Sequence, residues 1–415
     1  MQCIFLGIEK IIVDCMKRKI KYLILIVISL GWVRNISNVF ETPIWSLRDE
    51  IQHFDYINCL SDGYLPKAEH AISIYSDHLI DSLPPTWPDS MLTANGFGRK
   101  SYEANQPPLY YALLAAPNLL LKNFHVNPMI QIHTLRLLSL LMVLGAVLVL
   151  LYTANNLLVW SPFLAYTTLV AAGIVTLVAH GSYTTLGNDL LSPLFGVVLF
   201  HLFIQSFRAM DEIKYLFLIV AIASLATSFV KVSNALLFIP CTLLIRYRWN
   251  SLTKKHSILL IVLFLLFPII KYSLFHNSIV TNQQFSFGGF QNIWWFFRYF
   301  FASMLGLPLV YAAWVGVTLN LLLIFSLFFI FREQQINIES IVIETSLLTT
   351  LFVVLSAIFL NYAIHGVHWS LFRHYGATYP FVVIGFSAVW FIIQKNIRKS
   401  QEISNSDVRR IHERQ

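Results

Sequence analysis

Residues 137–154 read LLSLLMVLGAVLVLLYTA, an apolar stretch without a single charged side chain. A helix that crosses the hydrocarbon core of a bilayer needs about 20 such residues, so this stretch predicts a membrane-spanning helix. Similar stretches recur along the whole chain, and we expect each of them to form a span. They lie near 21–38, 161–179, 190–207, 214–230, 232–246, 256–275, 308–330, 345–362 and 376–393.

The composition of the 415 residues predicts the same fold class. Hydrophobic residues make up 57% of the chain and charged residues 12%, whereas soluble domains carry about 25% charged residues. This balance excludes a soluble or disordered chain. The four cysteines are too few for a secreted disulfide scaffold. We therefore predict an all-α, polytopic membrane protein with about ten transmembrane helices.

The net charge of +8 has its source in three basic segments. These segments are residues 1–21, the loop 246–255 and the tail 394–415, and the positive-inside rule places all of them in the cytoplasm. Nucleic-acid binding is not expected, because no basic stripe is interleaved with aromatic residues in a soluble domain. We predict one transmembrane domain, residues 1–393, followed by a basic cytoplasmic tail. We expect the protein to lie in a bacterial inner membrane, with both termini in the cytoplasm.

One long hydrophilic segment, residues 41–106, has only four basic side chains, which places it outside the cell membrane. Counting sides back from the cytoplasmic loop 246–255 puts residues 106 and 137 on the same external side. The apolar stretch 108–121 lies between them and is short for a span. We therefore predict a shallow or re-entrant helix there, preceded by a large first external loop that contains juxtamembrane helices.

The same counting gathers polar groups on the external face. Ionisable side chains beside membrane spans are costly and by default functional. The group comprises Asp49, Glu50, His53, Glu103, Asp189, Lys231, His365, His368, Arg373 and His374. Polar groups gathered on one face predict an external active site.

The residue types indicate a chemistry, although each has a plainer interpretation. A carboxylate such as Asp49 can accept a proton from an attacking hydroxyl, or it can belong to a solvated acidic loop. Lys231 and Arg373 suit a phosphate, or they anchor the chain at the membrane interface. Asp189 can cap the following helix or act as a second carboxylate facing Asp49. The three histidines near the C-terminus could join the acids around a metal, but their spacing is not diagnostic.

Six short motifs follow one another in a recognisable order. They are Asp49-Glu50 with His53, Gln106-Pro107-Pro108-Leu109-Tyr110-Tyr111, Arg136-Leu137-Leu138-Ser139, Asn188-Asp189, Lys231, and Arg373 with Tyr375 and Pro380. In this order they resemble the GT-C superfamily of membrane glycosyltransferases, which includes protein O-mannosyltransferases and the aminoarabinose transferases of lipid A. The resemblance runs from about residue 20 to residue 393 and departs from the family in the last motif, where His374 separates Arg373 from Tyr375.

The resemblance implies a transferase that takes a sugar from a polyprenyl phosphate or diphosphate and usually inverts the anomeric centre. Transfer would occur on the periplasmic or lumenal side, to a lipid-linked, glycan or protein acceptor. By the same resemblance Asp49 is the general base, and Glu50 and Asp189 are supporting acids. The implied substrate-binding residues are His53, Glu103, Gln106, Lys231, Arg373 and Tyr375. Some members use a divalent metal and others do not, so the metal stays open.

Two other classes of function stay open at this point. A transporter or flippase of a lipid-linked glycan intermediate would place charge along a path that reaches both faces. A structural protein of an envelope assembly would tolerate the substitution Asp49→Asn.

Overall fold

The computed structural model describes residues 2–44, 50–66, 106–182, 185–208, 212–248, 252–274, 338–363 and 376–390. Throughout these ranges the chain forms helices joined by turns and forms no strand. The predicted all-α fold class is therefore confirmed for them. The chain divides into two compact units, the first made of residues 1–284 and 372–379 and the second of residues 285–371 and 380–415.

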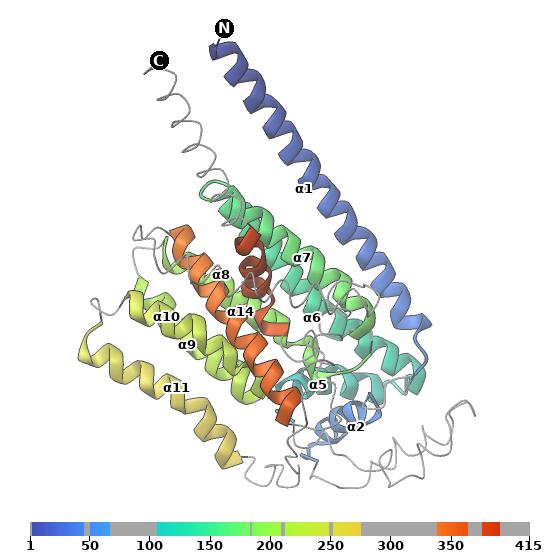
Figure 1. Ribbon diagram of the computed structural model, residues 1–415. Helices are drawn as coiled ribbons and strands as arrows, with labels where there is room; N and C mark the ends of the chain where they lie inside the picture. The colour runs from blue at the N-terminus through green and yellow to red at the C-terminus, as the bar shows by residue number, and fades with distance from the viewer. Residues whose placement is uncertain are drawn as a thin grey trace, which may run out of the picture. The chain divides into compact units, whose positions relative to one another are not determined.

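The first unit contains most of the described helices (Figure 1). They are α1 (Gln2–Glu41), α2 (Glu50–Ser61), α5 (Leu109–Asn123), α6 (Pro128–Leu157), α7 (Pro162–Ser182), α8 (Ser192–Ser206), α9 (Glu212–Leu225), α10 (Phe238–Tyr247) and α11 (Lys254–Leu274). Four short segments complete it: η3 (Asn188–Leu190), the π-helix η4 (Ala226–Val230), η5 (Val232–Leu237) and η8 (Gly376–Thr378). Helix α7 packs against α1 and α6, α8 packs against α6 and α9, and α11 packs on α9.

In the second unit the structure describes α14 (Ile338–Ala363) and the helix over residues 380–390. The two approach each other closely at Gly385. A Cβ atom on this glycine would overlap the Thr350 hydroxyl and would lie 2.8 Å from the carbonyl oxygen of Ser346. Glycine is required here because the neighbouring helix leaves no room for a side chain.

Local sequence fixes where α6 and α7 begin. The side chain of Asn127 accepts a hydrogen bond of 2.9 Å from the backbone N–H of Met129, and Pro128 occupies the first turn of α6. Ser161 accepts a bond of 3.2 Å from the N–H of Leu164 at the start of α7. Both are N-terminal caps that satisfy donors without partners inside the helix. They set the start of the two helices, α6 and α7, that contain the predicted spans 137–154 and 161–179.

Among the described residues, five helices are long and apolar enough to cross a membrane. They are Lys21–Glu41, Pro128–Leu157, Asn188–Ser206, Ile213–Val230 and Ile338–Ser356. Shorter apolar helices cover Pro162–Leu177, Asn234–Tyr247 and Gly376–Trp390. These helices indicate a membrane protein. The larger predicted number of spans stays a prediction, and the span expected at 308–330 lies outside the described residues.

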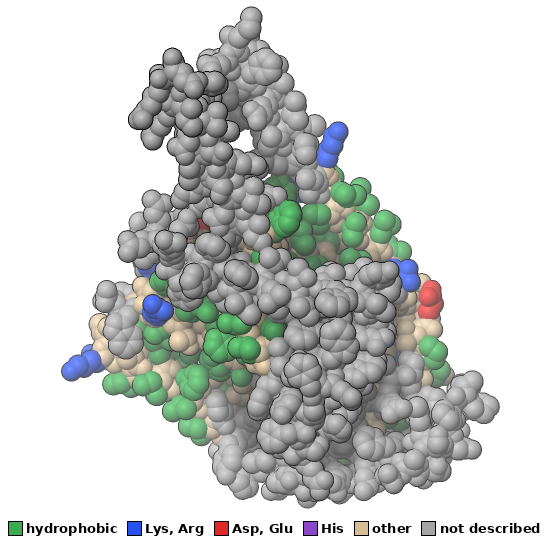
Figure 2. All heavy atoms as spheres, in the orientation of Figure 1, with side chains coloured by type: hydrophobic (Ala, Val, Ile, Leu, Met, Phe, Trp, Pro, Cys, Tyr) green, Lys and Arg blue, Asp and Glu red, His purple; other side chains and the backbone are tan. Residues whose placement is uncertain are grey.

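Large apolar side chains remain exposed on the outer helices of the first unit. Val33 on α1 is 69% exposed and Ile258 on α11 is 62% exposed. Hydrophobic side chains also dominate the described part of the surface in Figure 2, where lysine and arginine side chains are scattered. Such surfaces suit contact with lipid tails rather than with water.

Helix α5 has 15 residues, as short as the sequence predicted for this region, and packs against α2. Its external or re-entrant placement relative to a bilayer stays a prediction. Together α2 and α5 carry much of the candidate site.

Candidate functional site

The centre of the site is a buried ion pair between α2 and α6. The guanidinium of Arg136 holds the carboxylate of Glu50 in a two-pronged contact, Nε to Oε1 at 2.7 Å and Nη2 to Oε2 at 2.6 Å. Both side chains are fully buried. A planar guanidinium matches the two oxygens of a carboxylate, which makes this one of the stronger charge pairs in proteins.

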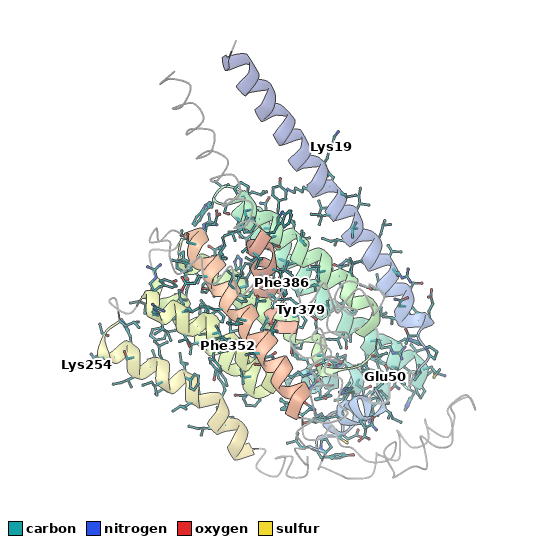
Figure 3. The ribbon with its side chains drawn as sticks, viewed as in Figure 1. Lys19, Glu50, Lys254, Phe352, Tyr379 and Phe386 are labelled. Carbon is teal, nitrogen blue, oxygen red and sulfur yellow. The ribbon has the colours of Figure 1, made fainter. Side chains whose placement is uncertain are left out.

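All five N–H groups of Arg136 donate hydrogen bonds. Besides the two bonds to Glu50, Nη1 donates to the carbonyls of Val39 at 3.0 Å and Thr42 at 2.7 Å, and Nη2 donates to Pro43 at 3.1 Å. These carbonyls lie at the C-terminal end of α1, where a positive charge is favourable. Arg136 therefore fixes both the end of α1 and the start of α2. In Figure 3, Glu50 of α2 lies near the C-terminal end of α1, and Lys19 lies farther along α1 toward its N-terminus.

A turn between α7 and α8, residues 186–189, connects the motifs. Each of its four consecutive residues contacts a different residue. The contacts are Leu186 N to Glu50 Oε1 at 3.1 Å, Gly187 N to the Tyr110 hydroxyl at 3.1 Å, Asn188 Nδ2 to Gln106 Oε1 at 3.1 Å, and an ion pair of Asp189 with Lys231. The turn thus brings together the start of α2, the start of α5 with the residue Gln106 just before it, and Lys231.

Tyr110 carries a chain of hydrogen bonds through the interior. Ser139 donates its single hydroxyl proton to the carbonyl of Leu135 at 2.8 Å, so Tyr110 is the donor in its 2.8 Å bond to Ser139. The Tyr110 oxygen in turn accepts the N–H of Gly187. Burial raises the pKa of Tyr110 above its ordinary value, so the phenol keeps the proton that it donates to Ser139.

His53 lies beside the same turn. Its Nδ1 is 2.8 Å from the hydroxyl of Tyr111, and a Cβ atom on Gly187 would lie 3.7 Å from its Nε2. Tyr111 also stacks on Tyr56 with ring centroids 4.0 Å apart, and the Tyr56 hydroxyl donates to the carbonyl of Gln106 at 3.3 Å. These contacts hold α2 against the start of α5.

Lys231 stands where a helix is interrupted. It has an extended backbone with φ −160° and ψ 137° between the π-helical segment η4 and the 3₁₀ segment η5. Asp189 lies in η3, just before α8, and its carboxylate accepts from the ammonium of Lys231. The N-cap of α8 is Leu191, which makes no side-chain capping bond. The ion pair with Lys231 is therefore an observed contact of Asp189, and Leu191 rather than Asp189 is the N-cap of α8.

The structure joins the predicted site residues that it describes. Glu50, His53, Gln106, Asp189 and Lys231 all lie around the 186–189 turn. The other predicted members lie outside the described residues; they are Asp49, Glu103, Arg373 and Tyr375. Their roles, like those of the described members, stay predictions.

Segment η8, which begins directly after Tyr375, packs against α8 and η5 within the first unit. A Cβ atom on Gly196 of α8 would overlap the carbonyl of Ala377, so only glycine allows this close approach. Segment η8 therefore lies beside α8, which follows Asp189, and beside η5, which follows Lys231.

The described residues contain no group of three or more His, Cys, Asp or Glu side chains that could hold a metal ion. The predicted metal candidates His365, His368 and His374 lie outside those residues. A metal at this site therefore stays an open prediction.

Two residues that shape the site were not recognised as such from the sequence. Arg136 belongs to the third motif, and a lone arginine at the edge of an apolar stretch is a signal of a buried partner. Asn234 belongs to none of the six motifs. Its Nδ2 donates to Ser192 Oγ and to the carbonyl of Ala226, both at 3.2 Å. A single asparagine at the start of a span offers no comparable sequence signal.

No protein-family model, no curated protein and no solved structure matches this chain. The proposals below therefore rest on the motifs and on the geometry of the site.

Proposed function

We propose that this protein is a membrane glycosyltransferase that moves a sugar from a polyprenyl-phosphate donor to an acceptor on the periplasmic or lumenal side. The observation that supports this most is the 186–189 turn, which contacts Glu50, Tyr110, Gln106 and Lys231 through four successive residues. Four of the motifs on which the family resemblance rests are thereby neighbours in space.

The ion pair between Glu50 and Arg136 distinguishes the proposed roles of Asp49 and Glu50. Both carboxylate oxygens of Glu50 are held by Arg136, so Glu50 serves to position the start of α2. Asp49 is bonded directly to this anchored residue, and we assign the general base to it. The carboxylate accepts the proton of the acceptor hydroxyl as its oxygen attacks the anomeric carbon. The bond between that carbon and the phosphate oxygen breaks, and the polyprenyl phosphate leaves with the bonding electrons.

Cations near the leaving group stabilise the charge that develops as this bond breaks. Lys231 supplies one such charge from its interrupted helix, and we assign Arg373 to the same task. The assignment of Arg373 rests on the family resemblance, and η8, which begins three residues later, packs against α8 and η5. The exposed apolar faces of the outer helices fit a protein whose substrate carries a lipid tail.

The proposed setting is a bacterial inner membrane with both termini in the cytoplasm and a lipid-linked glycan or a protein as acceptor. A divalent metal is compatible with the proposal, and no step above depends on one.

The test compares the lipids and envelope glycans of bacterial cells that express the protein with those of cells that do not. We expect one polyprenyl-phosphate sugar to decrease, polyprenyl phosphate to increase and one glycan to gain a residue, measured by mass spectrometry. Unchanged lipid and glycan pools would contradict the proposal. A lipid-linked sugar that changes leaflet without being consumed would indicate a flippase.

A further inference from the structure

The ion pair between Asp189 and Lys231 joins two elements that are far apart in sequence. Its side chains are largely buried, with 4% of Asp189 and 12% of Lys231 exposed. The carboxylate comes from η3 at the start of α8, and the ammonium comes from the break between η4 and η5. The cation that the proposed function assigns to the lipid phosphate is therefore already occupied by an anion of the protein.

The backbone around Lys231 is fixed, whereas its side chain is adjustable. The N–H of Lys231 donates to the carbonyl of Ala226 at 2.9 Å, and its carbonyl accepts the N–H of Asn234 at 3.0 Å. π-Helical turns of the kind formed by η4 occur often at functional sites. A lysine side chain has a flexible four-carbon stem and three donors, so it can change anion without movement of the backbone.

Asn234 holds this break in place and leaves one acceptor unused. Its Nδ2 must face the carbonyl of Ala226, because the reversed amide would set two acceptor oxygens against each other. The remaining Oδ1 is buried and accepts no hydrogen bond from the described residues. A buried acceptor without a donor is costly, and a hydroxyl group of a bound polar molecule would satisfy it. The break is therefore suited to a ligand as well as to its own internal bonds.

We propose that Asp189 competes with the substrate for Lys231. The phosphate of the polyprenyl donor displaces the Asp189 carboxylate from Lys231 when it binds, and the carboxylate returns to Lys231 when the lipid phosphate leaves. The inference rests on the proposed function. One ammonium is shared by two anions, the carboxylate and the phosphate. The apparent affinity for the phosphate is consequently lowered by the fraction of the protein in which Lys231 is engaged with Asp189.

The competition has a functional consequence. While the site is empty, the ion pair neutralises a largely buried ammonium, which would be unfavourable alone. After transfer, the same carboxylate competes with the product phosphate and so promotes its release. An enzyme that retained polyprenyl phosphate too tightly would be limited by that release.

The test measures binding of undecaprenyl phosphate to the full-length protein in detergent micelles, with undecaprenol as the uncharged ligand. For Asp189→Asn we expect affinity for the phosphate to rise about tenfold if the pair is formed about nine-tenths of the time. Lys231→Met should lose the preference for phosphate over the alcohol. Undecaprenol affinity should be unchanged in both variants. Asp62→Asn, which removes the acid of the more exposed pair with Lys122, is the matched control and should bind like the wild type.

Equal or weaker phosphate binding by Asp189→Asn would overturn the competition, as would an equal gain for undecaprenol. If Asp189→Asn does not fold, Asp189→Ser replaces it. Failure of both variants to fold would show that the pair holds the structure together, which also contradicts displacement. A wild-type protein that does not bind undecaprenyl phosphate at all would instead contradict the proposed function.

Discussion

Removal of the Arg136 guanidinium should destabilise the protein more than removal of any surface cation. The substitution Arg136→Met leaves the fully buried carboxylate of Glu50 without its cation. It also removes the donors to the carbonyls of Val39, Thr42 and Pro43. Breaking a buried ion pair by removal of one partner costs about 3–5 kcal/mol. We expect at least this loss in the free energy of unfolding.

Two further variants test the origin of the loss. Arg136→Lys keeps the charge but offers three donors to five acceptors, so at least two acceptors lose a partner. The loss is about 1–3 kcal/mol for a buried acceptor and smaller for the partly exposed carbonyls of Thr42 and Pro43. Lys122→Met removes a cation from the pair with Asp62, whose side chains are 20% and 42% exposed. Pairs as exposed as this one contribute about 0–1 kcal/mol, so Lys122→Met is the matched control.

The measurement is unfolding of the purified protein in detergent micelles by heat and by titration with sodium dodecyl sulfate. The expected order of stability is wild type, Lys122→Met, Arg136→Lys and Arg136→Met. The reasoning would be refuted if Arg136→Met unfolded together with Lys122→Met, because a fully buried ion pair and three hydrogen bonds to backbone carbonyls would then contribute nothing measurable.

Three further predictions concern packing, reactivity and topology. Gly196→Ala should lower the unfolding temperature because its Cβ would overlap Ala377, whereas Gly145→Ala meets only the Leu194 side chain at 3.5 Å and should be tolerated; equal unfolding temperatures would contradict this. In a variant that retains only Cys59, maleimide labelling at pH 8 should be slow in the native state and fast after unfolding, since burial raises the pKa of Cys59 to about 12 and leaves little thiolate. Equal labelling rates would show that the thiol is accessible. In a cysteine-free chain, a cysteine at exposed Leu65 should react with a membrane-impermeant maleimide on intact cells, and one at Lys399, outside the described residues, should not; the reverse pattern would overturn the proposed topology.

The fold could be predicted where one property of the chain determines it. Apolar stretches predict helices because a lipid environment requires every backbone polar group to be satisfied within the helix. The bounds were less accurate. The stretch 137–154 is part of a helix from Pro128 to Leu157, because Asn127 caps it well before the first residue of the apolar stretch. The interruption at Lys231 was predicted as a loop between spans and is a π-helical turn followed by one extended residue.

The sequence grouped several residues that the structure brings close together, but it did not predict their contacts. Counting sides along the chain placed Glu50, Asp189 and Lys231 on one face, and the structure links all three through the 186–189 turn. Which acid pairs with which cation depends on tertiary packing, and counting the sides of the membrane along the chain does not predict packing. The structure pairs Glu50 with Arg136 and Lys231 with Asp189. The phosphate is the second, proposed partner of Lys231.

The central claim is that the first loop supplies a base for sugar transfer at this site. The most direct measurement follows release of polyprenyl phosphate from a polyprenyl-phosphate sugar by protein reconstituted in lipid vesicles, for the wild type, Asp49→Asn and the control Asp62→Asn. We expect turnover by the wild type and by Asp62→Asn, and none by Asp49→Asn although it inserts and folds normally. Equal turnover by Asp49→Asn and the wild type would contradict the account.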